Sequence, residues 1–377
     1  MASTHPLREG QRPDFELGER RLVVVDLFAG CGGLTLGAAQ ATQDHGLGID
    51  VPLAVDFEQA PSDVFKANFP KAVVQVAAVE SYFDGALGAD PTKTELNVIE
   101  QVGTVDLLIG GPPCQGHSNL NNHTRRDDPK NRLYLRMARA TEVLRPRVVV
   151  IENVPAVVHD SQQVVTRTRQ QLERVGYQVA ATRVELVQFG IPQTRRRHIL
   201  LAVRSDALTS AASVEDLLEF APQPTLDLRW AIGDLEHAST DRWIDAPSKM
   251  SPENKKRIQW LIDNDEVNLP NDRRPECHQG DHSYVSMYGR LSWGQPAQTI
   301  TSGFGSMGQG RYGHPSQPRT LTPHEAARIQ GFPDYFRFDA AVTRTQLSVI
   351  IGNAVPPALT RVLTSRLIEL GILGHDS

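Results

Sequence analysis

The chain has 377 residues, of which 40% are hydrophobic and 22% are charged, and its formal net charge is -5 at pH 7. This length accommodates one large domain with an insertion or two domains, and the hydrophobic share supplies ordinary cores. The acidic balance argues against a protein that coats nucleic acid by bulk electrostatics, although it allows a local basic cleft.

The cellular compartment follows from what the composition lacks. No stretch approaches the roughly 20 apolar residues of a membrane span, and the start of the chain lacks the apolar core of a signal peptide. Cys31, Cys114 and Cys277 lie far apart and show no paired metal-ligand spacing, so we expect neither a disulfide framework nor a metal site. The sequence therefore predicts a cytoplasmic protein with no membrane partner.

The first half of the chain alternates short apolar runs with helical spacing. A polar lead is followed by apolar runs at residues 22–25, 51–55, 73–76, 105–109 and 147–151, with helical spacing at 60–69 and 133–144. Continuous apolar strands that alternate with helices are typical of a parallel sheet covered on both faces. The predicted fold class is α/β, a Rossmann-like sheet with helices on both faces, in which ligands bind beyond the carboxyl ends of the strands.

The second half is less regular. Two β-rich segments, residues 177–185 and 198–203, are close enough in the chain to form an antiparallel edge. The periodicity then dissolves into a stretch rich in proline, glycine and charge, until a threonine cap and a proline at residues 322–323 start another helix. We predict four segments: a flexible lead (1–20), a catalytic and cofactor-binding domain (21–205), a smaller irregular domain (206–318) and a return to the catalytic domain (319–377).

The segment GGPPCQGHS, residues 110–118, places Cys114 in a stiff turn directly after a buried strand. The prolines fix φ, and the glycines let the backbone approach a ligand closely. Although a single cysteine is more often a small buried hydrophobe, this placement indicates a nucleophile.

Glu152 ends the apolar run beside the strand that delivers Cys114, so we expect the two side chains to converge at one sheet edge. A strand-end glutamate alone is usually an ordinary carboxylate. A thiolate and a carboxylic acid in one pocket, however, suit attack on a heteroaromatic ring. The thiolate adds to a carbon, and the acid protonates or hydrogen-bonds a ring nitrogen. The adduct can accept a methyl group before the thiolate leaves.

A glycine turn after the first strand is a second candidate site. It consists of Phe28, Ala29, Gly30, Cys31, Gly32 and Gly33. Such a turn lets backbone amides and a helix N-terminus meet a polar ligand, and Asp56, after the second strand, is placed to bind ribose hydroxyls. The two features predict an adenosine-containing cofactor. The spacing is not that of the GxGxxG fingerprint, which argues against a nicotinamide-dependent oxidoreductase.

Arg195 and Arg197 lie in the segment QTRRR, just before a strand, where alternate residues share a face. A guanidinium can hold a base carbonyl or a phosphate bidentately. Adjacent arginines are more often a surface charge run, and these reach the nucleophile only if the sheet brings them together.

In this order, the segments DLFAGCGG, GGPPCQGHS, ENV, QTRRR, RTLTPHEAARIQGFPD and GNAVPP resemble the DNA (cytosine-5) methyltransferase family. The resemblance implies S-adenosylmethionine as methyl donor and a cytosine flipped out of double-stranded DNA as acceptor. It implies that Cys114 attacks carbon 6 and Glu152 engages ring N3. The further implied roles are support of the catalytic pocket by Arg195 and Arg197, and contact with the DNA backbone or the flipped nucleotide by Gln115 and Ser118.

The resemblance also assigns the cofactor and target sites. The donor-binding positions are residues 28–33, Asp56, Phe57, Asn353 and Val355, with Phe57 stacking on adenine. The variable target-recognition region of the family coincides with residues 206–318, where Arg273 and Arg274 are candidates for DNA contact. We expect the protein to act as a monomer, because flipping one base needs one active site, and a cognate restriction endonuclease is a further candidate partner.

Two departures from the family pattern stand out. His117 occupies a position where the family usually has phenylalanine, which adds a donor near the flipped base. After the third strand no acidic residue stands at the usual place for the adenine amine, so Glu80, Asp84 or a backbone carbonyl are the alternatives.

The alternative functions are an RNA (tRNA) cytosine-5 methyltransferase and a sequence-specific DNA-binding protein that has lost catalysis.

Overall fold

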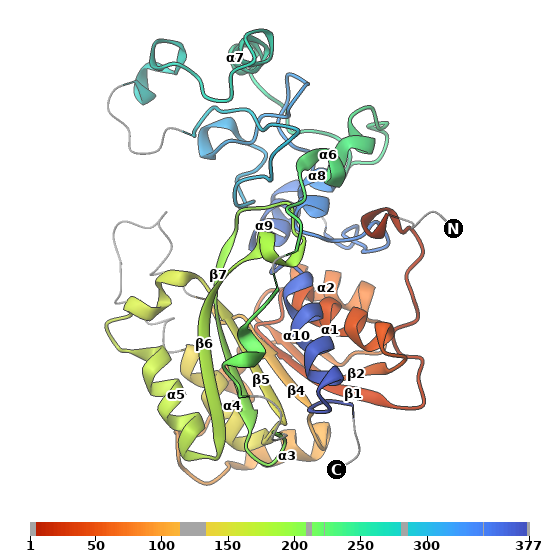
Figure 1. Cartoon of the computed structure of the whole chain (residues 1–377), viewed down its shortest axis with the longest axis vertical. Coiled ribbons are helices and arrows are strands. Elements are labelled where there is room, and N and C mark those ends of the chain that lie inside the picture. Colours follow the sequence, from red (N-terminus) through yellow and green to blue (C-terminus); the bar gives the residue numbers. More distant parts are fainter. Residues whose placement is uncertain are drawn as a thin grey trace. The chain divides into compact units, whose positions relative to one another are not determined.

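A computed structural model of the chain describes residues 5–113, 133–208, 213–221, 223–279, 286–341 and 343–374. The chain forms two compact units (Figure 1). The sheet unit comprises Pro13–Glu185, Arg196–Pro222 and Val355–Ser377, and the loop-rich unit comprises Met1–Arg12, Leu186–Arg195 and Gln223–Ala354. These bounds differ from the predicted divisions at residues 205 and 318, and the roles predicted for the domains stay predictions.

The described part of the sheet unit contains one seven-stranded sheet, in the order β3-β2-β1-β4-β5-β7-β6. The strands are β1 (Arg21–Leu27), β2 (Gly48–Asp56), β3 (Val74–Val76), β4 (Leu107–Gly110), β5 (Val148–Asn153), β6 (Tyr177–Glu185) and β7 (Arg196–Arg204). The strands from β3 to β5 pair in parallel, whereas β7 is antiparallel to both β5 and β6. The predicted α/β class, with its antiparallel edge, is confirmed.

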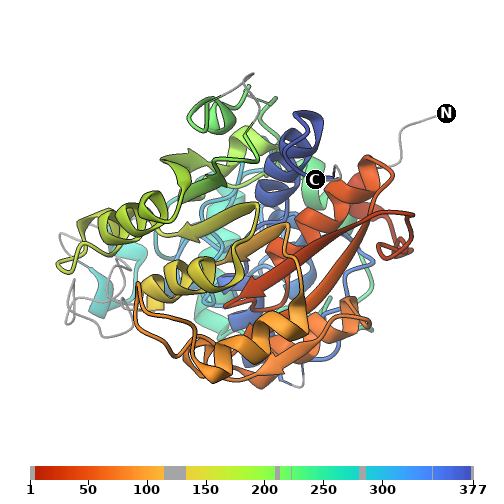
Figure 2. The same ribbon diagram turned by 90° about the horizontal axis from the view of Figure 1, so that it is seen from below.

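Helices cover both faces of this sheet, which is why its central strands are continuous apolar runs (Figure 2). They are α1 (Gly33–Asp44), α2 (Gln59–Asn68), α3 (Lys93–Val102), α4 (Leu133–Leu144), α5 (Val164–Arg174) and α10 (Ala358–Glu369). On one face, Met137 of α4 and Leu172 of α5 join Val25 and Leu108 of the strands in one core. Elsewhere α1 packs on α10, where a Cβ on Gly37 would lie 2.0 Å from the Pro357 carbonyl oxygen. That close approach requires glycine.

The loop-rich unit holds short helices joined by long irregular segments. They are α6 (Leu228–Ile232), α7 (Pro252–Asp263), α8 (Pro323–Ile329) and α9 (Arg344–Asn353). The predicted start of α8 is confirmed: the Thr322 side chain accepts a hydrogen bond from the Glu325 backbone, and the Glu325 carboxylate accepts one from the Thr322 backbone. Sequence reasoning missed α7, although Ser251 caps it and Pro252 occupies its first turn.

Single turns of 3-10 helix complete both units. They are η1 (Pro6–Arg8), η2 (Val79–Ser81), η5 (Pro155–His159), η6 (Leu186–Phe189), η7 (Asp216–Leu218), η8 (Gly233–Leu235), η9 (Asn271–Arg273), η10 (Glu276–His278) and η11 (Met307–Gln309). Short 3-10 segments are common connectors between longer elements.

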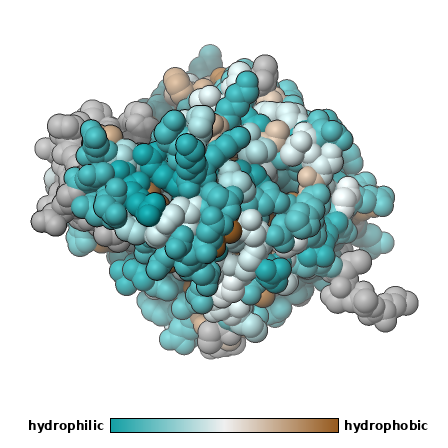
Figure 3. All heavy atoms as spheres, turned by 90° about the horizontal axis from the view of Figure 1, so that it is seen from above, coloured by the Kyte–Doolittle hydropathy of each residue, from teal (hydrophilic) through white to brown (hydrophobic). Residues whose placement is uncertain are grey.

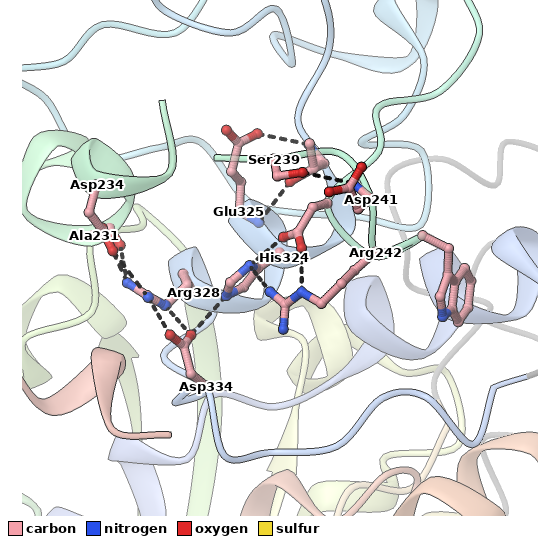
Figure 4. A network of polar contacts seen from close by, with 12 residues as sticks. Ala231, Asp234, Ser239, Asp241, Arg242, His324, Glu325, Arg328 and Asp334 are labelled. Carbon is pink, nitrogen blue, oxygen red and sulfur yellow. Dashed lines mark hydrogen bonds and ion pairs between the residues drawn. The ribbon is translucent and has the colours of Figure 1, made fainter. Parts of the chain in front are cut away.

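A polar network holds α8 within the loop-rich unit (Figure 4). The His324 ring lies between two carboxylates, with Nδ1 2.6 Å from Asp245 and Nε2 2.8 Å from Asp334. The guanidinium of Arg328 donates to the same Asp334 at 2.6 Å and to the Ala231 carbonyl at 3.2 Å. Segments far apart in the sequence are therefore joined by charged groups that are mostly buried.

The described part of the N-terminal lead packs into the fold, unlike the flexible lead that we predicted. In the loop-rich unit Leu7 is buried and its carbonyl accepts a hydrogen bond from the Asp334 backbone. In the sheet unit Phe15 is buried and its carbonyl accepts one from Ile49. The correction has a simple cause, because single apolar residues in a polar segment are enough to anchor it.

Within the described residues no single helix is long and apolar enough to cross a membrane, although α9 and α10 taken together as a bent pair meet the criteria of length and composition.

Candidate active site

Strands β4 and β5 place Glu152 at the start of the cysteine segment. The two strands pair in parallel with Gly110 opposite Ile151, so Glu152 lies beside Gly111. A Cβ on Gly111 would lie 3.3 Å from the Glu152 carboxylate, which therefore rests against this backbone. Cys114, Gln115, His117 and Ser118 lie outside the described residues. The predicted adjacency of the two strands is observed.

Glu152 is held by an arginine. Arg197, near the start of β7, places Nε 2.5 Å from the Glu152 carboxylate, and both side chains are largely buried. This contact follows from the antiparallel pairing of β7 with β5, in which Glu152 lies opposite Ile199. The contact is an ion pair without hydrogen-bond geometry, and charge attraction in a site with little access to water keeps the carboxylate beside the guanidinium. The structure therefore brings together two of the predicted site residues, Glu152 and Arg197.

Sequence reasoning missed Asn153, the next residue of the ENV segment. Its side-chain amide donates to the Pro112 carbonyl at 3.0 Å, and its oxygen accepts from the Val154 backbone at 2.8 Å. Asn153 thus ties the end of β5 to the segment that leads to Cys114.

Opposite Asn153 in the sheet lies His198, and burial lowers the pKa of this histidine to about 4. His198 is consequently neutral at pH 7.

The glycine turn between β1 and α1 has a strained backbone. Phe28 (φ 58°), Gly30 (φ 54°) and Gly32 (φ 87°) all lie in the left-handed region, which is costly for a bulky residue such as phenylalanine. A Cβ on Gly32 would collide with the Phe65 ring at 2.8 Å, whereas a Cβ on Gly30 would meet no atom within 4 Å. The turn is therefore packed on one side and open at Gly30.

Asp56 and Phe57 lie at the carboxyl end of β2, beside this turn. The Asp56 carboxylate accepts hydrogen bonds from the Gly30 backbone at 2.8 Å and from the Glu58 backbone at 2.9 Å. Burial raises the pKa of Asp56, and these two hydrogen bonds oppose the shift. Phe57 is 77% exposed, and Val76, opposite Asp56 on β3, is 42% exposed. Two apolar side chains thus stand open to solvent next to a half-buried carboxylate.

The two acidic candidates for the adenine amine differ in their surroundings. Asp84 accepts a hydrogen bond from the Thr92 hydroxyl at 2.5 Å, so this carboxylate is already engaged within its own loop. Glu80, in η2, is exposed.

Within the glycine turn between β1 and α1, burial raises the pKa of the Cys31 thiol to about 12, so Cys31 is not a nucleophile at neutral pH.

Arg195 lies in the loop-rich unit and is buried. Its Nη1 donates to the carbonyls of Ile300 (3.0 Å) and Gly352 (3.3 Å), so it joins the QTRRR segment to the end of α9. Two buried glutamines that sequence reasoning missed support the same junction: Gln193 donates to the Gln330 side chain, which donates to the Ile351 carbonyl. Asn353, the last residue of α9, is exposed, and Val355 belongs to the sheet unit.

The comparison with known protein families identifies the family of the chain. Residues 22–369 match the model of the C-5 cytosine-specific DNA methylases. The chain belongs to this family. It is thus a DNA methyltransferase that acts on carbon 5 of cytosine, which confirms the resemblance inferred from the six motifs. Membership implies S-adenosylmethionine as the methyl donor.

Relatives of the methyltransferase match nearly all of its length. It is 41% identical to the Type II methyltransferase M1.BsuMI of Bacillus subtilis (strain 168), over 95% of this chain and 83% of the relative. It is 30% identical to the Type II methylase M.HgiDII of Herpetosiphon aurantiacus, over 91% and 94%. The solved structure of the Entamoeba histolytica methyltransferase EhMeth, 16% identical, superimposes with a TM-score of 0.62 over 93% of this chain and 99% of that one, which shows a common fold.

The two arginines predicted to contact DNA have opposite environments in the methyltransferase. Arg273, at the end of η9, is exposed, whereas Arg274 is 8% exposed and its Nε donates to the Leu269 carbonyl at 3.1 Å. The prediction of a DNA contact therefore fits Arg273, and the burial of Arg274 fits a role in holding its own loop. No pattern in the dipeptide distinguishes the two arginines.

Proposed function

We propose that the methyltransferase modifies a flipped-out cytosine in double-stranded DNA through a covalent adduct between Cys114 and carbon 6. The observation that carries this proposal is the Glu152 carboxylate, which is held by Arg197 and rests against Gly111, three residues before Cys114. A carboxyl group fixed beside the nucleophile segment is what protonation or hydrogen bonding of ring N3 requires.

The chain's own residues carry the following steps. The Cys114 thiolate forms a bond to carbon 6, and the displaced electron pair moves through the ring to N3, where Glu152 supplies a hydrogen bond or a proton. Arg197 keeps the carboxyl group aimed at the base. After methylation a base removes the proton on carbon 5, and the electron pair of that C–H bond forms the double bond between carbons 5 and 6. The bond from carbon 6 to sulfur breaks to release the Cys114 thiolate, and a proton taken up by N3 returns to Glu152. Asn153 fixes the backbone from which this segment departs.

The glycine turn and its neighbours fit S-adenosylmethionine, which supplies the electrophilic methyl group. The open space at Gly30 admits a ligand, and the exposed Phe57 offers a flat apolar face for adenine. We assign the donor site to residues 28–33, Asp56, Phe57, Asn353 and Val355. Asp56 still has lone pairs for ribose hydroxyls beyond its two backbone contacts. The exposed Glu80 is the acidic residue that fits the adenine amine better.

The proposed target-recognition domain is the irregular region at residues 206–318, of which residues 223–318 belong to the loop-rich unit. Arg273 contacts DNA there, Gln115 and Ser118 contact the DNA backbone or the flipped nucleotide, and Arg195 supports the catalytic pocket. The Type II designation of the relatives supports a cognate restriction endonuclease as a partner and bacterial cytoplasm as the location. The protein acts as a monomer in this proposal.

The test uses the purified full-length protein with S-adenosylmethionine and two acceptors, duplex DNA and transfer RNA. We expect methyl transfer to DNA and none to RNA; transfer only to RNA would establish the alternative function. The variant Cys114→Ala should transfer no methyl group while retaining cofactor affinity, and full turnover by it would refute the covalent route. With duplex DNA that carries 5-fluorocytosine at the target base, the wild type should form a stable adduct.

A further inference from the structure

Helix α7 of the loop-rich unit rests on a small core of its own. Its buried residues Ile258 and Leu261 pack with Leu269, Tyr288 and Met307. The opposite side of the helix carries Lys255, Lys256 and Gln259, all exposed. Because the core clamps one side of α7, the exposed side is presented in a fixed orientation.

One arginine of α7, Arg257, and one of the neighbouring η9, Arg273, are supported by aromatic rings. The guanidinium of Arg273 lies 4.5 Å from the centre of the Trp260 ring, and that of Arg257 lies 5.9 Å from the centre of the Tyr288 ring. The two arginines are also joined, since Arg257 Nε donates to the Arg273 carbonyl at 3.2 Å. Tyr288 itself has φ 60°, a costly conformation for an aromatic residue that is typical of functional positions.

The positive charge of this region is not neutralised by ion pairs. In the described part of the chain neither Arg257 nor Arg273 has a carboxylate partner; the remaining polar contact of Arg257 is with the Asn254 side chain. Other arginines of the same unit have a carboxylate partner, such as Arg290, which pairs with Asp265 at 2.8 Å. The exposed carboxylate that acts on Lys256 and Arg257 is Glu253. Exposed carboxylates also occur here, at Glu253 and Asp263 of α7 and at Asp272 of η9, but in the described part of the chain none of them forms an ion pair with Arg257 or Arg273.

We propose that Lys255, Lys256, Arg257 and Arg273, here called the α7 basic face, bind the phosphate backbone of the target DNA. The proposal rests on the proposed function of the surrounding region as target-recognition domain. A stacked guanidinium keeps its N–H groups directed outward for a phosphate oxygen. With a net charge of -5, the chain needs such a local positive surface to attract a polyanion.

The surrounding surface agrees with a polyanionic partner. Figure 3 views the loop-rich unit from the end that carries α7, and shows a face dominated by hydrophilic residues with hydrophobic residues scattered singly. A broad apolar area would favour a protein partner instead. Contacts to phosphate position a protein on DNA and carry no sequence information, so the α7 basic face sets affinity and leaves base reading to other residues.

The adjacent arginines provide a matched test. Arg273→Ala removes an exposed cation, whereas Arg274→Ala removes a buried one that holds the Leu269 carbonyl. We expect Arg273→Ala and the double variant Lys255→Ala/Lys256→Ala to raise KM for duplex DNA by about 3- to 10-fold with little change in kcat. The slope of log affinity against log salt concentration should fall by about 1 for each cation that no longer reaches a phosphate. Arg273→Lys should recover part of the affinity.

Controls separate charge from folding. Lys93→Ala removes an exposed cation at the start of α3 in the sheet unit and should change neither KM nor the salt slope. Arg274→Ala should lower the melting temperature, which Arg273→Ala should leave unchanged. An unaltered salt slope in both α7 variants would refute the proposal, and so would a change in the DNA sequence that they methylate. If the wild type methylates no duplex DNA, the proposed function fails; the same variants are then compared in duplex binding alone.

Discussion

The two compact units of the methyltransferase are ordered by different forces. In the sheet unit, backbone pairing and a shared apolar core set the geometry, so that Glu152 is placed by the register of β5 with its neighbours. In the loop-rich unit, short helices are joined by buried charges such as those around His324 and Arg328. Regular pairing fixes the acid beside the nucleophile segment, whereas charged networks allow an irregular surface to vary around a stable frame.

The largest expected effect tests whether the sheet unit contributes geometry or charge at Glu152. Glu152→Gln retains the shape of the side chain but cannot supply a proton or balance Arg197, and we expect kcat for methyl transfer to fall by about 10²- to 10⁴-fold. The measurement is single-turnover methyl transfer to duplex DNA. Thermal unfolding serves as the control: loss of the charge partner of the largely buried Arg197 should lower the melting temperature, so the rates are compared at a temperature where both proteins are fully folded. Wild-type kcat in this variant would show that β5 only positions the segment.

Arg328→Ala tests the dependence of the loop-rich unit on its network. The substitution leaves the Asp334 carboxylate without its guanidinium and empties a buried site, so we expect a decrease of about 3–5 kcal/mol in the free energy of unfolding. Urea denaturation of the full chain provides the measurement. The matched change in the sheet unit is Arg139→Ala, where Arg139 is equally buried and pairs with Glu95 at 2.6 Å. A decrease below about 1 kcal/mol for Arg328→Ala would contradict the comparison.

Acid should weaken the loop-rich unit through Glu325. Burial would raise the pKa of Glu325, but hydrogen bonds from Arg319 and His314 outweigh this and hold the pKa at about 2, below the usual 4.5. A depressed carboxyl pKa contributes stability above pH 4.5 that is lost as the pH falls through 2. For one group this amounts to about 3 kcal/mol. Unfolding followed between about pH 5 and 2 should show the decrease, and Glu325→Gln, already less stable at neutral pH, should show a smaller one.

Two buried groups, His198 and Asp26, make the stability of the sheet unit depend on pH in opposite directions between about pH 4 and 7. Burial lowers the pKa of His198 to about 4, so the unfolded chain binds the proton more tightly and stability falls as the pH drops from 6.5 to 4. Burial also raises the pKa of Asp26 to about 7, so its contribution is lost as the pH rises from 3.8 to 7. We expect a nearly flat profile in the wild type. In His198→Asn the free energy of unfolding should be about 3 kcal/mol higher at acidic pH, relative to its value at neutral pH, than in the wild type. An unchanged dependence of this free energy on pH would show that His198 is hydrated.

The sequence predicts the sheet unit well because its signals are local. Continuous apolar runs mark strands such as β5, and the segment that carries Cys114 follows directly from one of them. The contacts that complete the site are not local: Asn153 reaches Pro112 across 41 residues, and Gln193 reaches Gln330 across 137. Such pairs depend on the topology of the whole chain. Helices α3 and α7 were missed although Thr92 and Ser251 cap them.

The smallest expected effect compares equivalent caps in the two units. Thr92 and Thr322 each accept a hydrogen bond from the backbone of a buried glutamate, Glu95 and Glu325, in reciprocal capping boxes. Thr92→Ala and Thr322→Ala should each cost about 1 kcal/mol in the free energy of unfolding, and serine should restore it. The two alanine variants should differ in their KM for S-adenosylmethionine.

The Thr92 hydroxyl also donates to Asp84, in the loop that follows β3 at the edge of the proposed donor site. Thr92→Ala therefore releases this loop and should raise KM for S-adenosylmethionine, whereas Thr322→Ala should not. Equal KM values in the two variants would mean that the Asp84 loop is independent of donor binding. A rise in KM for Thr92→Ala alone, reversed by Thr92→Ser, would instead show that a helix cap of the sheet unit both stabilises the fold and positions the loop beside the donor.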